Sequence, residues 1–159
     1  MRNSHSINYG KCVFSDFEIR SNLKGKRKLA KFIPYLVYQY TKKECYLQYT
    51  FVSDDFLLEL NQTHLHHNTY TDIITFDLSS LNASSILGDI YISIDRVHEN
   101  ANLHQTSFLN EAIRVVLHGA LHLSGFGDKS STEQKKMRKL EDEWMLKFKQ
   151  FIESDKQEL

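Results

Sequence analysis

The sequence predicts an α+β fold: a small mixed sheet of four strands, packed with about five or six helices. Two features lead to this prediction. Short segments rich in β-branched and aromatic residues, which favour strands, are interspersed with helical segments in the first part of the chain, and the C-terminal half is helical. The chain has 159 residues, of which 41% are hydrophobic and 25% are charged. A chain of this kind can bury its own core, and we expect residues 1–159 to form one domain.

Four segments are predicted to form strands, namely residues 7–19, 44–52, 72–78 and 87–94. They alternate between apolar and polar positions or are rich in β-branched and aromatic side chains. A polar loop at residues 79–85 joins the last two. Because this connection is short, we expect these two strands to form an antiparallel pair.

Five segments are predicted to form helices: residues 26–40, a segment that Asp54 caps, and residues 95–103, 107–123 and 131–154. The single proline of the chain, Pro34, lies inside the first helix and is expected to kink or split it. Ser130 and Glu133 have the spacing of a capping box at the start of the last helix. The apolar stripe of that helix is explained by core packing; it consists of Met137, Leu140, Trp144, Phe148 and Phe151.

Charge and composition restrict the setting in which the protein works. Twenty basic and twenty acidic residues give a net charge of zero, so nucleic-acid binding would need a local basic patch. Cys12 and Cys45 lie in apolar segments and are expected to be reduced, buried thiols. Residues 1–5 lack the apolar core of a signal peptide, and no apolar stretch is long enough to span a membrane. We therefore expect a cytoplasmic protein.

The helix at residues 107–123 carries the most informative side chains of the chain. It is apolar on most of its circumference, which predicts that it is buried. His118 and His122 are four residues apart, so their rings lie on one face of the helix, about 6 Å apart along its axis. Two imidazoles at that spacing can bind one metal ion. An exposed histidine pair is the alternative, but this helix is predicted to be buried, and two buried histidines without partners would be costly.

Two glycines follow this helix and bracket Phe126. Glycine tolerates the left-handed backbone that ends helices, so the chain can reverse at Gly125 and Gly127 and bring Asp128 toward the histidines. Three protein ligands with one open position are typical of catalytic zinc sites. We expect one zinc ion per chain, with nickel, iron or manganese as alternatives.

The spacing H-x-x-x-H-x-x-G-x-x-D closely matches the zincin pattern H-E-x-x-H-x-x-G-x-x-H, which predicts a zincin-like metal-binding helix. In zincin peptidases the glutamate of that pattern is the general base, and Gly119 stands in its place here. Without this proton acceptor, peptide hydrolysis by the zincin route is disfavoured.

Three segments resemble one known family. The segment HGALHLSGFGD at residues 118–128 resembles the signature HGxLHLxGYDH of the YbeY endoribonucleases, which are bacterial rRNA maturation factors. LELN at residues 58–61 with TDIITF at 71–76 resembles a second block of this family, and LGDIYIS at 87–93 resembles a third. The resemblance implies a cytoplasmic, metal-dependent endoribonuclease specific for single strands. It further implies a role in 16S rRNA 3′-end processing and in ribosome quality control.

The resemblance also implies roles for single residues. His118 and His122 correspond to the first two zinc ligands, and Asp128 stands where the third histidine is expected; aspartate is a competent zinc ligand. Leu65 stands where the family has an arginine that contacts RNA phosphate. Arg114, one turn before His118, is a candidate substitute, and a solvated or structural arginine is the alternative.

Three further positions are implied to lie near the metal. Asp89 matches an acidic residue of the family and is expected either to orient a ligand histidine or to end its strand in a turn. Thr71 and Thr75 are implied to line the cleft. Two basic clusters can supply phosphate contacts, although solvated helix faces explain each of them as well: Lys24 to Lys28 with Lys31, and Lys135, Lys136, Arg138 and Lys139.

The sequence leaves three functions open. The favoured one is a nuclease whose partners are single-stranded RNA, the 16S rRNA precursor and the ribosomal small subunit, with neither DNA nor a membrane expected. A zinc metallopeptidase is the second, and Gly119 counts against it. The third is a non-catalytic, metal-containing factor that binds RNA or the ribosome, which the leucine at position 65 keeps open.

Overall fold

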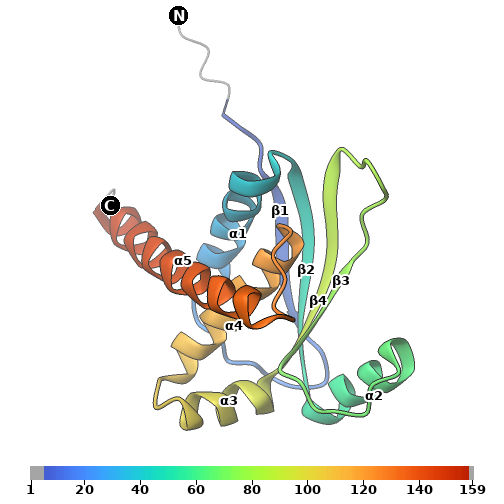
Figure 1. Ribbon diagram of the computed structural model, residues 1–159. Helices are drawn as coiled ribbons and strands as arrows, with labels where there is room; N and C mark the ends of the chain where they lie inside the picture. The colour runs from blue at the N-terminus through green and yellow to red at the C-terminus, as the bar shows by residue number, and fades with distance from the viewer. Residues whose placement is uncertain (1–5, 158–159) are drawn as a thin grey trace, which may run out of the picture.

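The computed structural model describes residues 6–157, and four strands of this part form one mixed sheet (Figure 1). The strands are β1 (Gly10–Asp16), β2 (Glu44–Val52), β3 (Ile73–Asp77) and β4 (Ser85–Ser93), and their order is β1-β2-β4-β3. β2 is parallel to both β1 and β4, whereas β3 is antiparallel to β4. The predicted α+β class and the antiparallel pairing of the last two strands are confirmed. Residues 1–5, on which part of the cytoplasmic expectation depends, lie outside the described residues.

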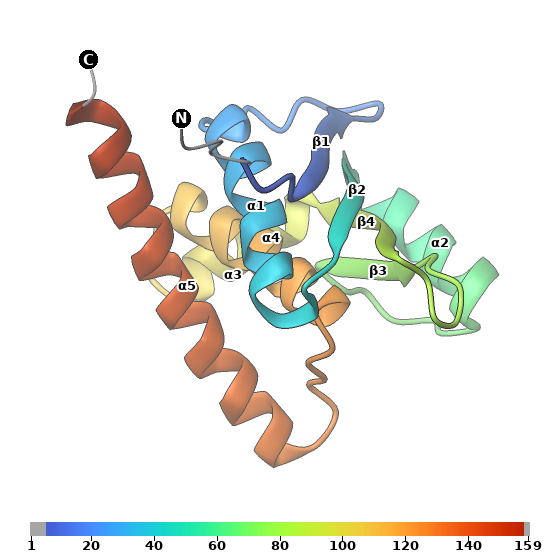
Figure 2. The same ribbon diagram turned by 90° about the horizontal axis from the view of Figure 1, so that it is seen from above.

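Five helices cover the sheet in the described part of the chain: α1 (Lys26–Thr41), α2 (Asp54–Leu65), α3 (Ile94–Leu103), α4 (Phe108–Leu123) and α5 (Ser131–Gln157). Seen from above, α1 and α4 lie between the sheet and α5, while α2 lies on the other side of the sheet (Figure 2). No helix within residues 6–157 is both long and apolar enough to cross a membrane.

The main core lies between the sheet and the layer of α1 and α4, with α5 closing it from outside. Its fully buried side chains come from all of these elements and include Leu29, Ile33, Leu36, Tyr49, Ile90, Ile92, Leu117, Leu121 and Trp144. The hydroxyl of Tyr49 on β2 donates a hydrogen bond of 2.8 Å to the carbonyl of Val116, which ties the sheet to α4. A smaller cluster under α2 contains Val52, Leu57 and Ile74. The helix that carries the histidines is thus held between two layers.

Several local predictions need correction. α1 continues through Pro34, so of the two predicted outcomes, a kink or a split, the split is wrong; the proline is buried among the core residues of the helix. α2 is capped by Ser53, whose hydroxyl accepts from the amide of Phe56, and Asp54 is instead paired with Arg96. β1 ends earlier than predicted because Glu18 adopts a φ of 57°, a left-handed turn that extended strands do not allow.

Both cysteines are free and buried, as predicted. Burial raises the pKa of the Cys45 thiol to about 12 and that of Cys12 still further. Thiols with such raised pKa values stay protonated at neutral pH and are poor nucleophiles and metal ligands. They therefore act as small apolar core residues.

Candidate metal centre

Three donor atoms converge at the C-terminal end of α4. Nε2 of His118 and Nε2 of His122 lie 2.8 Å apart, and Oδ2 of Asp128 lies 3.3 Å from each of them. The ligand atoms that these residues offer all lie within 4.8 Å of one another. The structure therefore brings together the three residues that the spacing predicted, in an arrangement able to hold one divalent ion.

The second nitrogen of each imidazole is engaged by an acceptor. Nδ1 of His122 lies 2.9 Å from the carbonyl oxygen of Phe126, and Nδ1 of His118 lies 2.7 Å from Oε1 of Glu141. A carbonyl oxygen or a carboxylate can only accept, so in the neutral rings the proton resides on Nδ1. The Nε2 lone pairs then point into the shared space, which is the tautomer that metal binding requires.

The reversal of the chain after α4 depends on Gly125, whose φ is 103°. The amide of Gly125 donates to the carbonyl of His122, and the amide of Phe126 donates to that of Leu121. The Phe126 ring then packs edge-on against Tyr40 with 4.8 Å between centroids. This turn aims the Phe126 carbonyl at His122 and directs the following chain back toward the histidines.

The start of α5 fixes the segment that carries Asp128. The hydroxyl of Ser130 accepts from the amide of Glu133, and the Glu133 carboxylate accepts from the amides of Lys129 and Ser130, which confirms the capping box. The same carboxylate lies beside Gly127, where an added Cβ would come within 2.7 Å of it. Asp128 is thus held between the glycine turn and a capped helix.

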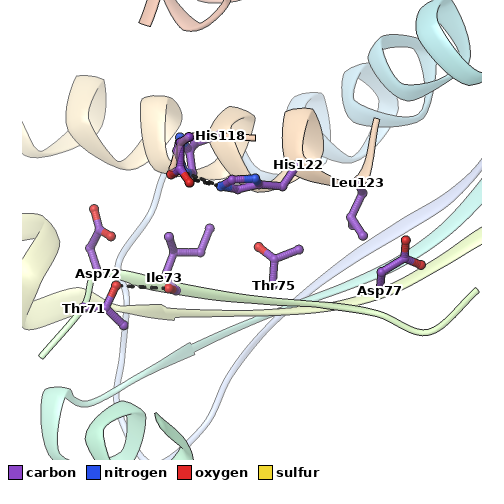
Figure 3. Close-up of a pocket in the computed structure, with 9 residues that line it drawn as sticks. Thr71, Asp72, Ile73, Thr75, Asp77, His118, His122 and Leu123 are labelled. Atoms are coloured by element: carbon purple, nitrogen blue, oxygen red, sulfur yellow. Dashed lines mark hydrogen bonds and ion pairs between the residues drawn. The ribbon is translucent and has the colours of Figure 1, made fainter. Parts of the chain in front are cut away.

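A cleft of about 380 Å³ opens beside these three residues. Its walls are formed by Thr71, Asp72, Ile73, Thr75, Asp77, His118, His122, Leu123 and Asp128. Figure 3 shows the histidines of α4 facing β3 across this space, with the side chains of Asp72, Thr75 and Asp77 pointing toward α4. The cleft-lining places implied for Thr71 and Thr75 are confirmed. Oγ1 of Thr75 is buried and has no hydrogen-bond partner among the described residues.

Three ionisable groups in and beside the cleft have shifted pKa values. Burial lowers the pKa of His118, but the hydrogen bond and charge of Glu141, together with Asp128, outweigh it, so the net pKa is raised. Burial raises the pKa of Glu141, and its bonds to His118 and Arg114 reverse this, so the net pKa is lowered. Burial raises the pKa of Asp72, which the charge of His118 offsets in part. Perturbed groups that gather in one cleft are typical of functional sites.

Comparisons with known proteins identify the family of this chain. The family model described as Endoribonuclease YbeY matches residues 16–149. The protein named Endoribonuclease YbeY from Flavobacterium psychrophilum is 42% identical over 128 residues, which cover 80% of this chain and 87% of that protein. The chain belongs to the YbeY family.

One further relative and one solved structure are also similar to this chain. The Endoribonuclease YbeY of Cytophaga hutchinsonii is 50% identical over 105 residues, which are 64% of this chain and 73% of that relative. The solution structure of TM1509 from Thermotoga maritima superposes with a TM-score of 0.57 at 27% identity, covering 87% of this chain and 92% of the other. The sequence resemblance and the predicted fold class are therefore both confirmed.

Arg114, for which a phosphate contact and a structural role were both left open, is paired with two carboxylates. Its Nη1 lies 3.1 Å from Oε2 of Glu141 and its Nη2 lies 2.8 Å from Oδ1 of Asp142. The side chain is only 18% exposed. A guanidinium held by two carboxylates favours the structural alternative for Arg114 over a phosphate contact in place of the arginine that Leu65 replaces. Leu65 itself is the last residue of α2 and is 41% exposed.

Asp89 does not face the histidines. An added Cβ at Gly88 would meet Leu123 of α4, so the neighbouring Asp89 side chain points to the opposite face of the sheet. There it lines a shallow groove with Tyr46 and Leu78. The carboxylate that contacts His118 comes from α5 instead and belongs to Glu141.

The sequence analysis missed Glu141 and Asp72. Glu141 is buried although it is charged, and it lies four residues after Met137 and three before Trp144, inside the apolar stripe of α5. A charge on that stripe is the signal that would have found it. Asp72 directly precedes β3, within a segment that the family resemblance had covered.

Proposed function

We propose that this chain is a metal-dependent endoribonuclease specific for single-stranded RNA. In this proposal it acts in the cytoplasm on the 16S rRNA precursor of the ribosomal small subunit, in 3′-end processing and ribosome quality control. One observation carries the proposal: two imidazole nitrogens and a carboxylate oxygen converge at an open cleft in a chain of the YbeY family.

His118, His122 and Asp128 would hold one zinc ion. The donor set fits zinc, because imidazole nitrogens and carboxylates are its common ligands and three protein ligands leave one position open. When bound, the ion supplies Lewis-acid chemistry for phosphodiester cleavage. Both imidazoles already present Nε2, so little reorganisation is needed to bind it.

The residues of the chain supply orientation and phosphate contacts. Exposed basic side chains follow Asp128: Lys129 in the turn before α5, and Lys135, Lys136, Arg138 and Lys139 on the first turns of that helix. The ammonium group of Lys136 lies 5.1 Å from the ring centroid of Phe126, whose carbonyl binds His122. The net charge of zero gives the whole protein no general attraction for a polyanion. This local basic patch would give a polyanion a place to bind beside the cleft.

The packing around Gly119 argues against a zincin peptidase. An added Cβ at this position would lie 3.0 Å from Cδ1 of Ile73 and 3.2 Å from Cγ2 of Ile90. The helix is packed closely against the sheet there, so a glutamate would fit only if these two isoleucine side chains gave way. Position 119 therefore lacks the zincin base, and its close packing against the sheet disfavours a larger side chain there.

One set of assays tests the proposal. Bound metal is measured after purification without chelators, and then single-stranded RNA, the same RNA as a duplex, immature small subunits and an unfolded protein are offered to wild type, His118→Ala and His67→Ala. His67 is an exposed loop residue and serves as the control. We expect cleavage of the single strand and of the immature subunits, lost in His118→Ala and kept in His67→Ala. Peptide cleavage lost in His118→Ala, or bound metal without cleavage of either polymer, would overturn the proposal.

A further inference from the structure

We propose that Glu141 is a positioning residue of the metal site: it holds His118 in the tautomer and orientation that present Nε2 to the ion. The inference rests on the proposed function, because it assumes that His118 is a metal ligand. In this inference α5 supplies none of the three ligands but supplies the carboxylate that orients one of them.

The contact between Glu141 and His118 is short and shielded from water. Oε1 of Glu141 lies 2.7 Å from Nδ1 of His118, and the Glu141 side chain is only 8% exposed. The two residues are 23 positions apart and come from α4 and α5, so the contact depends on the packing of these two helices. A buried carboxylate at this distance accepts a hydrogen bond from the Nδ1–H group. It thereby excludes the neutral tautomer that carries the proton on Nε2.

Arg114 keeps Glu141 in place. Its guanidinium occupies the other carboxylate oxygen, Oε2, at 3.1 Å, and is itself anchored by Asp142 at 2.8 Å. Both oxygens of Glu141 thus accept hydrogen bonds from different donors. An amide cannot replace this group, because its NH₂ would face either Arg114 or Nδ1 of His118. In the first case two donors oppose each other, and in the second the histidine is driven toward the wrong tautomer.

The two ligand histidines are therefore oriented by different means. His122 is oriented by the backbone carbonyl of Phe126, which a side-chain substitution does not remove. His118 depends on a single carboxylate. This difference allows the role of Glu141 to be tested without touching any ligand.

The test measures zinc affinity by competition with a chromophoric chelator for wild type, Glu141→Gln, Glu141→Ala and a control. The control is Glu143→Ala, which removes an exposed carboxylate of the same helix that pairs with Lys147. We expect zinc affinity to fall about 10- to 100-fold in both Glu141 variants, because outer partners of ligand histidines have effects of this size. The Glu143→Ala affinity should match that of wild type.

The second readout is the ¹⁵N chemical shift of the His118 ring in the metal-free protein, at alkaline pH where the ring is neutral. We expect the proton on Nδ1 in wild type and a shift of population toward Nε2–H in Glu141→Gln. Should Glu141→Ala fail to fold, the glutamine variant decides alone. Folded Glu141→Gln with wild-type zinc affinity and an unchanged tautomer would overturn the inference. If the wild-type protein binds no zinc but His118 carries its proton on Nδ1, the proposed function is overturned. The hydrogen bond between His118 and Glu141 would still be established.

Discussion

Oδ2 of Asp128 lies 3.3 Å from Nε2 of His122, although α4 ends and the chain reverses between the two residues. We expect Asp128→Ala to lower zinc affinity at least about 100-fold and to abolish RNA cleavage, because a ligand contributes more than its outer partners do. Asp77→Ala is the matched control. It removes a carboxylate that lines the same cleft and accepts, within residues 6–157, a hydrogen bond from the amide of Ser79 alone. Zinc affinity is measured by metal titration. An equal loss of affinity in both variants would show that Asp128 acts only through its negative charge and not as a ligand.

Asp128→His tests the ligand that the family resemblance leads one to expect at this position. We expect the variant to keep its zinc, and the pH profile of RNA cleavage to move toward lower pH. A neutral ligand cancels less of the charge of the ion than a carboxylate does, so the ion remains a stronger Lewis acid. The measurement is kcat/KM for a single-stranded RNA as a function of pH. Identical profiles would indicate that Asp128 is not a ligand.

Gly119→Glu tests why this helix lacks the zincin glutamate. We expect the free energy of unfolding to fall by at least about 2 kcal/mol, since the side chain must enter the apolar contact with Ile73 and Ile90. Peptidase activity should not appear. Gly119→Ala is the control, because its gain in helix propensity of about 1 kcal/mol opposes a mild crowding of the same two side chains. Urea denaturation gives both values, and a fully stable glutamate variant would contradict the close packing.

Features that depend on neighbours a few residues away were predictable from the sequence. The spacing of His118 and His122, the glycine turn and the capping box at Ser130 all appear in the structure as expected. Each is determined by local backbone geometry, which the order of residue types reveals directly. The candidate ligand set could therefore be assembled before the fold was known.

Features that depend on tertiary packing were not predictable in the same way. The contact of Glu141 with His118 requires knowledge of which face of α5 lies against α4. The parallel pairing of β2 with both of its neighbours joins segments with long connections between them. Neither alternative left open for Asp89 agrees with the structure: the residue lies inside β4 rather than at its end, and alternation along the strand places it on the face opposite to buried Ile90.

Lys136→Ala tests the basic patch that we propose for RNA binding. We expect KM for single-stranded RNA to rise and the slope of log affinity against log salt to become shallower by about 0.7, the value for one lost phosphate contact. Lys149→Ala, at an exposed position further along the same helix, should leave both quantities unchanged. Zinc content and thermal unfolding are measured in parallel, because Lys136 also lies over the Phe126 ring. A loss of affinity that is independent of salt would contradict an electrostatic role.

Asp72→Asn should make the metal-free protein more stable at neutral pH. Burial raises the pKa of Asp72 above its ordinary value of 3.8, so the native state keeps the proton over a range in which the unfolded chain has lost it. The contribution of Asp72 to the free energy of unfolding therefore falls as pH rises from 3.8 through the raised pKa. Above that pKa the contribution stays low. Asparagine has no charge to bury, and its carbonyl oxygen can still accept from Asn100, which lies 3.3 Å from the carboxylate.

The urea midpoints of wild type and Asp72→Asn, followed across pH with a chelator present, should coincide in acid and separate toward neutral pH, with the variant higher. All other acidic groups are common to both proteins, so the difference isolates Asp72. A constant gap at every pH would mean that the substitution acts through packing. A wild type that is the more stable protein at neutral pH would mean that the ionised carboxylate is stabilised in the cleft rather than destabilised by burial.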